Sequence, residues 1–386
     1  MLLAVVVVDL IGFAIVVPIL PFYAVQYGAG GLEVGAIVAS FALFQFAFGP
    51  VWGRLSDRVG RRPVLLATIA GNTVALAALG FADSLATILA ARVLAGAFSG
   101  NVGVATAYIT DVTADEDRPR WMGLIGLSFA IGFTLGPAIG GVASKAGYAA
   151  PMFVAAALSA VNLVQAWMRL PESPEHARRA GDAAPALSRI DALRQPGVAL
   201  LTSTNFAFAF AVTQLETVFQ LYMLDRFGWD AFAVSMILFG MAIVMGGVQG
   251  GAIRTLSARF GERTLIRTGA VVLAAGFVAT PAAPTVVWLL VPLGLAAVGR
   301  ALLQPSLMTL ASFRTAEHTR GAVMGTYQSA AALARVVGPL VAGHAYDVAR
   351  PAPFAIAAAA TAVVFALATS LPAPPLEDVA HPDAGV

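Results

Sequence analysis

Five charged side chains stand inside long apolar stretches of the 386-residue sequence: Asp9, Arg92, Glu216, Arg300 and Arg335. Charged groups in apolar segments are costly, and they normally face a water-filled space or a partner of opposite charge. A carboxylate in such a place can carry a proton if burial or the loss of a cationic partner changes its proton affinity. Asp9 and Glu216 are therefore candidates for binding protons or substrate, and Arg92 is a candidate for modulating them.

Other kinds of chemistry lack the residues they require. The chain has no cysteine, which excludes disulfides, thiolate metal sites and cysteine nucleophiles. Its four histidines show no metal-ligand spacing, and no His/Asp/Glu cluster stands at the end of an apolar segment. We therefore expect neither an enzyme nor a metal site. We also expect no cofactor and no nucleic-acid partner.

The elements that carry the five charges must be membrane helices. Hydrophobic residues make up 59% of the chain and charged residues only 11%, against roughly 25% charged in soluble domains. About 20 apolar residues are needed to cross a bilayer as a helix, and the apolar runs lack the alternation of a membrane β-barrel. We predict an all-α polytopic protein with twelve spans, at about 1–23, 32–53, 63–82, 86–110, 121–144, 148–170, 198–224, 230–254, 264–281, 284–308, 320–344 and 351–371.

The basic residues predict the orientation of these spans. The connections after the even-numbered spans hold 16 of the 23 lysines and arginines, and the connections after the odd-numbered spans hold 3. Basic residues collect on the cytoplasmic side, so both termini are expected in the cytoplasm, with the protein in a bacterial inner membrane. Met1 opens directly into an apolar run without a basic flank, and we expect a longer native N-terminus.

The sequence repeats itself in two halves. The segment 53-GRLSDRVGRRPVLL-66 is similar to 254-RTLSARFGERTLI-266, with an offset of 201 residues, and Gly136-Pro137 recurs 202 residues later as Gly338-Pro339. Parallel repeats of this kind are typical of secondary transporters, which bind substrate between the halves. The predicted organisation is a six-helix bundle over 1–170, a cytoplasmic linker over 171–197, a second bundle over 198–371 and a cytoplasmic tail over 372–386.

Several motifs resemble those of the major facilitator superfamily. Residues 53–62 look like its signature loop, and Asp9 with Gly12, Pro18 and Pro21 resembles the first-helix motif of its twelve-span drug–proton antiporters. Arg92, Gly96 and Gly100 resemble its fourth-helix motif, and 222-YMLDRFGWDAF-232 looks most like the tetracycline-efflux branch. The motif of the fifth helix, which is the one that indicates export, is matched by Gly132, Gly136, Pro137, Gly140 and Gly141.

The resemblance implies a gate in the signature loop, which joins the second and third spans. Asp57 would cap the N-terminus of the eleventh span and Arg58 would pair with Asp111, so that the cytoplasmic side closes. The plainer interpretation is that the arginines only anchor the topology. Ala258 replaces Asp57 in the second repeat, so only the first copy could form this latch. The residues assigned to the gate are Gly53, Asp57, Arg58, Gly60, Arg61, Arg62 and Asp111.

The fifth span predicts a close helix contact. Gly132, Gly136 and Gly140 are spaced by four residues and share one face, where small residues let membrane helices approach.

In other places the chain departs from the tetracycline exporters. No acid stands in 268–280 and no histidine in 239–249, so the proton relay of that branch cannot be transferred to this chain.

We therefore expect proton-coupled efflux of small amphiphilic compounds by alternating access, in a monomer. Glu216 among phenylalanines suits a lipophilic cation. The alternative is an importer or uniporter of a small metabolite, including an anionic one. Depth along the spans would match Glu216 with Arg92 or Arg335 and Asp9 with Arg300, whereas the family resemblance associates Asp9 with Arg92, and the pairings stay open. The residues assigned to the central cavity are Asp9, Arg92, Asn205, Glu216, Gln220, Arg300 and Arg335.

Overall fold

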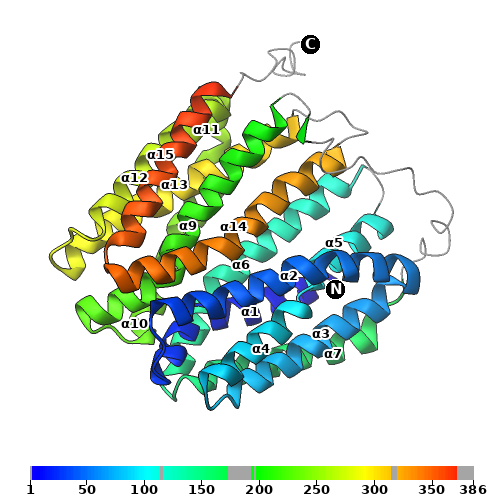
Figure 1. Cartoon of the computed structure of the whole chain (residues 1–386). Helices are drawn as coiled ribbons and strands as arrows, with labels where there is room; N and C mark the ends of the chain where they lie inside the picture. Colours follow the sequence, from blue (N-terminus) through cyan, green and yellow to red (C-terminus); the bar gives the residue numbers. More distant parts are fainter. Residues whose placement is uncertain (1, 114–115, 173–192, 195–196, 314–319, 372–386) are drawn as a thin grey trace, which may run out of the picture.

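The fold is a bundle of long helices, shown by a computed structural model in Figure 1. The structure describes residues 2–113, 116–172, 193–194, 197–313 and 320–371. Within these ranges the regular elements are all helices, and no strand is found. The expected all-α fold is therefore confirmed.

The helices account for all twelve predicted spans. Eleven of them are long and apolar enough to cross a membrane, and the remaining one, α14, has 29 residues but is more polar. Two spans are interrupted, the fourth between α4 and α5 and the eighth by a π-helix, η2. In chain order the elements are α1 (Leu2–Gln26), α2 (Gly31–Val59), α3 (Arg61–Gly80), α4 (Leu85–Ala97), α5 (Asn101–Val112), α6 (Arg118–Ser144), α7 (Ala149–Arg169), α9 (Val198–Phe227), α10 (Ala231–Gly247), η2 (Val248–Ala252), α11 (Ile253–Phe260), α12 (Glu262–Ala279), α13 (Val286–Phe313), α14 (Arg320–Val348) and α15 (Ala352–Ser370).

The expected loop over residues 54–62 is mostly helix. The second span continues to Val59, and a single residue, Gly60, separates it from α3. Gly60 has a φ of 113° and its counterpart Gly261 has a φ of 74°, a region that favours glycine because it lacks a Cβ. Apolarity predicted where the membrane segment ends, but the helix itself continues beyond that point.

The sequence repeat is also a structural repeat. Arg62, at the start of α3, donates a hydrogen bond to the carbonyl of Trp167 near the end of α7. Its counterpart Arg263, at the start of α12, donates to the carbonyl of Thr369 at the end of α15. These arginines are 201 residues apart and their acceptors 202, so the same tie between span three and span six occurs in each half.

The two ends of the bundle differ in how the halves meet. We call the end with Leu2, Gly60 and Ser370 the terminal face, and the end with the α1–α2 turn at 27–30 the opposite face. Towards the opposite face one hydrophobic cluster joins both halves, with Ile19 of α1 and Phe219 of α9 fully buried in it. Towards the terminal face each half has a cluster of its own. In the part of the chain that the structure describes, the halves therefore share a hydrophobic core at the opposite face and have separate cores at the terminal face.

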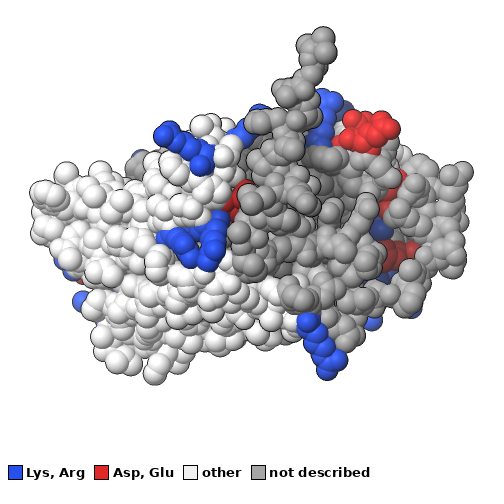
Figure 2. Space-filling model, turned by 90° about the horizontal axis from the view of Figure 1, so that it is seen from above, with Lys and Arg blue, Asp and Glu red and all other residues white. Residues whose placement is uncertain are grey.

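The outer surface is that of a membrane protein. Large apolar side chains such as Val74, Trp167, Val287 and Trp288 are more than half exposed. Figure 2 looks down on the molecule from above, and wide uncharged areas are visible at its left, with basic side chains nearer the undescribed residues. Exposed apolar patches of this extent need a partner, and for spans of this length the partner is lipid.

Candidate transport site

Three charged side chains from three helices of the C-terminal half lie together at mid-membrane depth. Arg300 of α13 donates from Nη1 to Oε1 of Glu216 in α9 over 2.6 Å. Arg335 of α14 is exposed and lies within electrostatic reach of both. In the described part of the chain, Arg335 has neither a hydrogen bond nor an ion pair. The cluster therefore has two cations for one anion.

The Glu216–Arg300 pair was not among the pairings predicted from depth, and the reason lies in the helix ends. The prediction ended the seventh span at 224 and began the tenth at 284, whereas the helices end at Phe227 and begin at Val286. At 1.5 Å per residue, Glu216 then lies about 17 Å and Arg300 about 21 Å from the opposite face. Long side chains bridge the remaining difference.

Asp9 lies in the N-terminal half and has an amide partner. Asn101, the first residue of α5, donates from Nδ2 to Oδ1 of Asp9 over 2.6 Å. Arg92 is buried, and its guanidinium stacks 4.2 Å above the ring of Phe41. Both pairings considered for Asp9, with Arg92 and with Arg300, are therefore wrong. Sequence reasoning missed Asn101, although an amide in the apolar run 86–110 is a usable signal.

The two predicted cavity amides have different surroundings from the charges. Asn205 is buried and donates from Nδ2 to the carbonyl of Tyr327 over 2.9 Å. Gln214, not predicted, donates from Nε2 to the carbonyl of Gly338 over 3.1 Å. Both bonds tie α9 to α14 within one half. Gln220 is also buried, at 2% exposure, so the charged side chains rather than these amides present polar groups between the halves.

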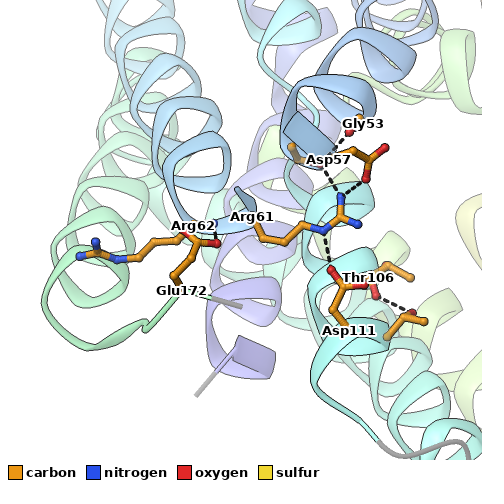
Figure 3. A network of polar contacts seen from close by, with 9 residues as sticks. Gly53, Asp57, Arg61, Arg62, Thr106, Asp111 and Glu172 are labelled. Carbon is orange, nitrogen blue, oxygen red and sulfur yellow. Dashed lines mark hydrogen bonds and ion pairs between the residues drawn. The ribbon is translucent and has the colours of Figure 1, made fainter. Parts of the chain in front are cut away.

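The predicted gate residues form a network at the terminal face, shown in Figure 3. Arg61 holds Asp111 from Nε at 2.7 Å and Asp57 from Nη1 at 2.6 Å, and it also donates to Ser56. The sequence predicted an ion pair between Arg58 and Asp111, whereas in the structure Arg61 forms the ion pair with Asp111. The reason is that α3 begins at Arg61 and directs that side chain towards the end of α5. The residues just before Arg320 lie outside the described ranges, and so does the proposed cap by Asp57.

Gly53 and Arg62, two further predicted gate residues, make contacts on either side of the turn at Gly60. The carbonyl of Gly53 accepts a hydrogen bond from Ser56 Oγ over 2.8 Å. The backbone N–H of Arg62 donates to Glu172 over 3.1 Å, which ties the start of α3 to the chain after α7. The described contacts of this network all join elements of the N-terminal half.

The glycines of the antiporter motif permit two close helix contacts. A Cβ on Gly140 would lie 2.7 Å from the carbonyl oxygen of Ile15 in α1. A Cβ on Gly141 would lie 2.6 Å from Cβ of Ser235 in α10, which belongs to the other half. Gly132 and Gly136 also face α1, against Leu10 and Ala14, and Pro137 lies inside α6. The expected close packing of this helix is confirmed.

A contact across the halves at the opposite face was missed in the sequence. Asp347, at the end of α14, accepts hydrogen bonds from the backbone N–H groups of Gly31 (2.7 Å) and Leu32 (2.8 Å), at the start of α2. At the related position of the repeat, Lys145 lies over the ring of Phe232, at 3.8 Å. Lys145 and Asp347 are 202 residues apart, and Gly31 and Phe232 are 201.

Two related six-span halves that carry ionisable groups deep within their spans are typical of a membrane transporter. The sequence profile of the Major Facilitator Superfamily matches residues 2–255 and 252–385. The chain belongs to this superfamily. It is therefore a multi-pass membrane protein, and its relatives are transporters rather than enzymes.

Two sequence relatives and one solved structure indicate which members of the superfamily this chain resembles. The tetracycline resistance protein of class C from Escherichia coli is 31% identical over 356 residues, which cover 89% of this chain and 88% of that protein. Human major facilitator superfamily domain-containing protein 10 is 30% identical over 81% of this chain and 72% of that protein. The crystal structure of the human organic anion transporter MFSD10 (TETRAN) has a TM-score of 0.72 and 26% identity, and it covers 95% of this chain and 97% of that one. The chain therefore resembles drug-efflux members of the superfamily.

Proposed function

We propose that this protein exports small amphiphilic compounds across a bacterial inner membrane in exchange for protons, by alternating access. The observation that carries the proposal is the division of the hydrophobic core. Among the described residues one cluster joins the halves at the opposite face, and each half has its own cluster at the terminal face. Rocking one half against the other would reverse this arrangement. With basic residues inside, the terminal face is cytoplasmic and this state takes substrate from the cytoplasm.

The sequence relatives support the export direction. Several are tetracycline resistance proteins, with five of them between 28% and 31% identical to this chain. Gly141, which approaches Ser235 closely, supports the same direction. It belongs to the motif of the fifth span, α6, and in the family resemblance this motif implies export. Tetracycline itself is not proposed as the substrate, because the acid and histidine of that branch are absent from the corresponding spans.

Asp9 is the proposed proton carrier. It is a half-buried carboxylate within the first span, and Asn101 gives it a single hydrogen bond. An amide stabilises the ionised carboxylate much less than an arginine would, so moderate changes in hydration suffice to change its protonation. Glu216 differs because Arg300 already neutralises it. We assign the proton to Asp9 and substrate contact to the cluster around Glu216.

Transport in proteoliposomes tests the proposal. Uptake of ethidium and of naphthalene-2-sulfonate would be followed with and without a proton gradient, with an enclosed pH dye as a second readout. We expect the gradient to accelerate transport in the wild type and to have no effect in Asp9→Asn. Asp83→Asn, an exposed acid outside the spans, is the matched control and should behave as wild type. Transport of both probes at one rate with and without the gradient in the wild type would refute proton coupling.

A second candidate substrate class has its own supporting observation. The human relative is described as an organic anion transporter, and the cluster of Arg300, Arg335 and Glu216 has an excess positive charge. This arrangement favours an anionic compound over the lipophilic cation that the sequence suggested for Glu216.

A further inference from the structure

We propose that Arg335 and Arg300 bind the anionic group of an amphiphilic substrate and that Glu216 is a tethered competitor, which occupies Arg300 until the substrate displaces it. This inference rests on the proposed transport function and specifies the ligand chemistry of the same site. It requires that the arginines face the other half, that they remain available, and that an apolar surface lies opposite them.

The charged cluster faces the N-terminal half. Two of its helices, α9 and α14, pack against α1 and α2 of that half. Glu216 is 45% exposed and Arg300 is 32% exposed, although both lie deep in their spans. A charged side chain exposed to lipid at this depth would be strongly unfavourable. The exposed groups therefore point into the space between the halves.

The arginines have unused capacity for an anion. Glu216 engages only Nη1 of Arg300, and Nη2 of that arginine makes no hydrogen bond among the described residues and is not buried. Arg335 is exposed and, in the described part of the chain, makes no hydrogen bond or ion pair. A guanidinium offers five N–H donors and binds carboxylates and sulfonates in a fork. Arg335 is thus the open position of the site, and Arg300 is the position that Glu216 blocks.

An aromatic surface lies at the same depth in the other half. Phe133 of α6 is 40% exposed and contacts the ring of Phe13 in α1, with centroids 6.0 Å apart. Phe13 in turn packs against Phe41 of α2, which is buried beneath Arg92. These three helices are the ones that contact the C-terminal half. At 1.5 Å per residue, the three phenylalanines lie about 15–20 Å from the opposite face, the depth of Glu216, Arg300 and Arg335. An aromatic body and an anionic group on one molecule would match the two sides.

Binding to the purified full-length protein in detergent tests this assignment without any need for transport. The probes are naphthalene-2-sulfonate and trimethyl-2-naphthylammonium, which share a ring system and differ in charge. Titration calorimetry should show that the wild type binds the sulfonate more tightly than the ammonium compound. Arg335→Gln should weaken sulfonate binding at least about tenfold, the loss expected for a charge-assisted hydrogen bond. Arg335→Lys, which keeps the charge, should lose less.

The competitor role makes a prediction of opposite sign. Glu216→Gln should tighten sulfonate binding about tenfold, because Arg300 is freed and the local charge rises. Arg254→Gln, at the terminal face, is the control and should leave both affinities unchanged. The inference is overturned if the wild type binds neither probe, if it prefers the ammonium probe, or if Glu216→Gln weakens sulfonate binding. The binding assay uses neither a gradient nor vesicles. Its outcome therefore does not depend on whether the transport assay finds proton coupling.

Discussion

Asp347 of α14 accepts a hydrogen bond from the backbone N–H of Gly31 over 2.7 Å, across the boundary between the two halves. The carboxylate thereby caps the positive N-terminus of α2. The contact resembles the one predicted for Asp57 at the other end of the pathway, with the roles of the two helices exchanged. This contact, which we call the lock, joins the halves at the opposite face in addition to the apolar core that they share there.

Removing this lock should open the opposite face. In Asp347→Ala, two N–H groups at the start of α2 lose their acceptor, so the state closed at that face loses stability relative to the alternative state. We expect faster reaction of an introduced Gln220→Cys with a membrane-impermeant maleimide, in a chain that has no cysteine of its own. Asp225→Ala is the control, because the described contacts of Asp225, with Tyr346 and Arg350, stay within one half. Equal labelling rates in the two backgrounds would contradict the lock.

A steric change at the same place should have a related effect. A Cβ on Gly343 would overlap the carbonyl oxygen of Gly31, and backbone atoms cannot move aside as a side chain can. Gly343→Ala should disfavour closure by about 1–3 kcal/mol, the usual range for overpacking, and should raise the same maleimide labelling. Gly325→Ala, on the same helix with open space around it, should label at the wild-type rate.

The antiporter motif can be tested within α6 in the same way. Gly140→Ala would place its Cβ 2.7 Å from the carbonyl oxygen of Ile15, and we expect a lower thermal unfolding midpoint and reduced transport. Gly126→Ala lies on the same helix with nothing near its Cβ and should be neutral or slightly stabilising, because alanine is the better helix former. Equal melting temperatures for the two variants would show that the close packing is unimportant.

The two acids on Arg61 should differ in what they contribute. The side chain of Asp111 is 5% exposed and that of Asp57 is 61% exposed. Asp111→Asn breaks a buried ion pair, and we expect a stability loss of about 3–5 kcal/mol. Asp57→Asn breaks an exposed one, worth about 0–1 kcal/mol, and should leave the protein folded but impair transport. Thermal unfolding and proteoliposome efflux measured on both variants separate these effects, and normal efflux in Asp57→Asn would remove its gating role.

The sequence predicted elements better than contacts. Apolar runs located all twelve spans, and an offset of 201–202 residues revealed the repeat that Arg62 and Arg263 reproduce in space. The pairing of Glu216 with Arg300 could not be derived, because an error of two or three residues at a helix end moves a side chain by about 3–5 Å along the membrane. The Asp347 cap joins residues 316 positions apart, and only the packing of the halves brings them together.

Distances between the halves test the central proposal of alternating access most directly. Spin labels would be placed on Val59→Cys and Phe260→Cys at the terminal face, and in a second sample on Phe81→Cys and Val287→Cys at the opposite face, all of them exposed positions. Electron-spin distance measurements on the otherwise wild-type protein and on Asp347→Ala would be compared. We predict that Asp347→Ala shortens the first distance and lengthens the second. A change of both distances in the same direction, or of neither, would contradict the proposed rocking of the two halves.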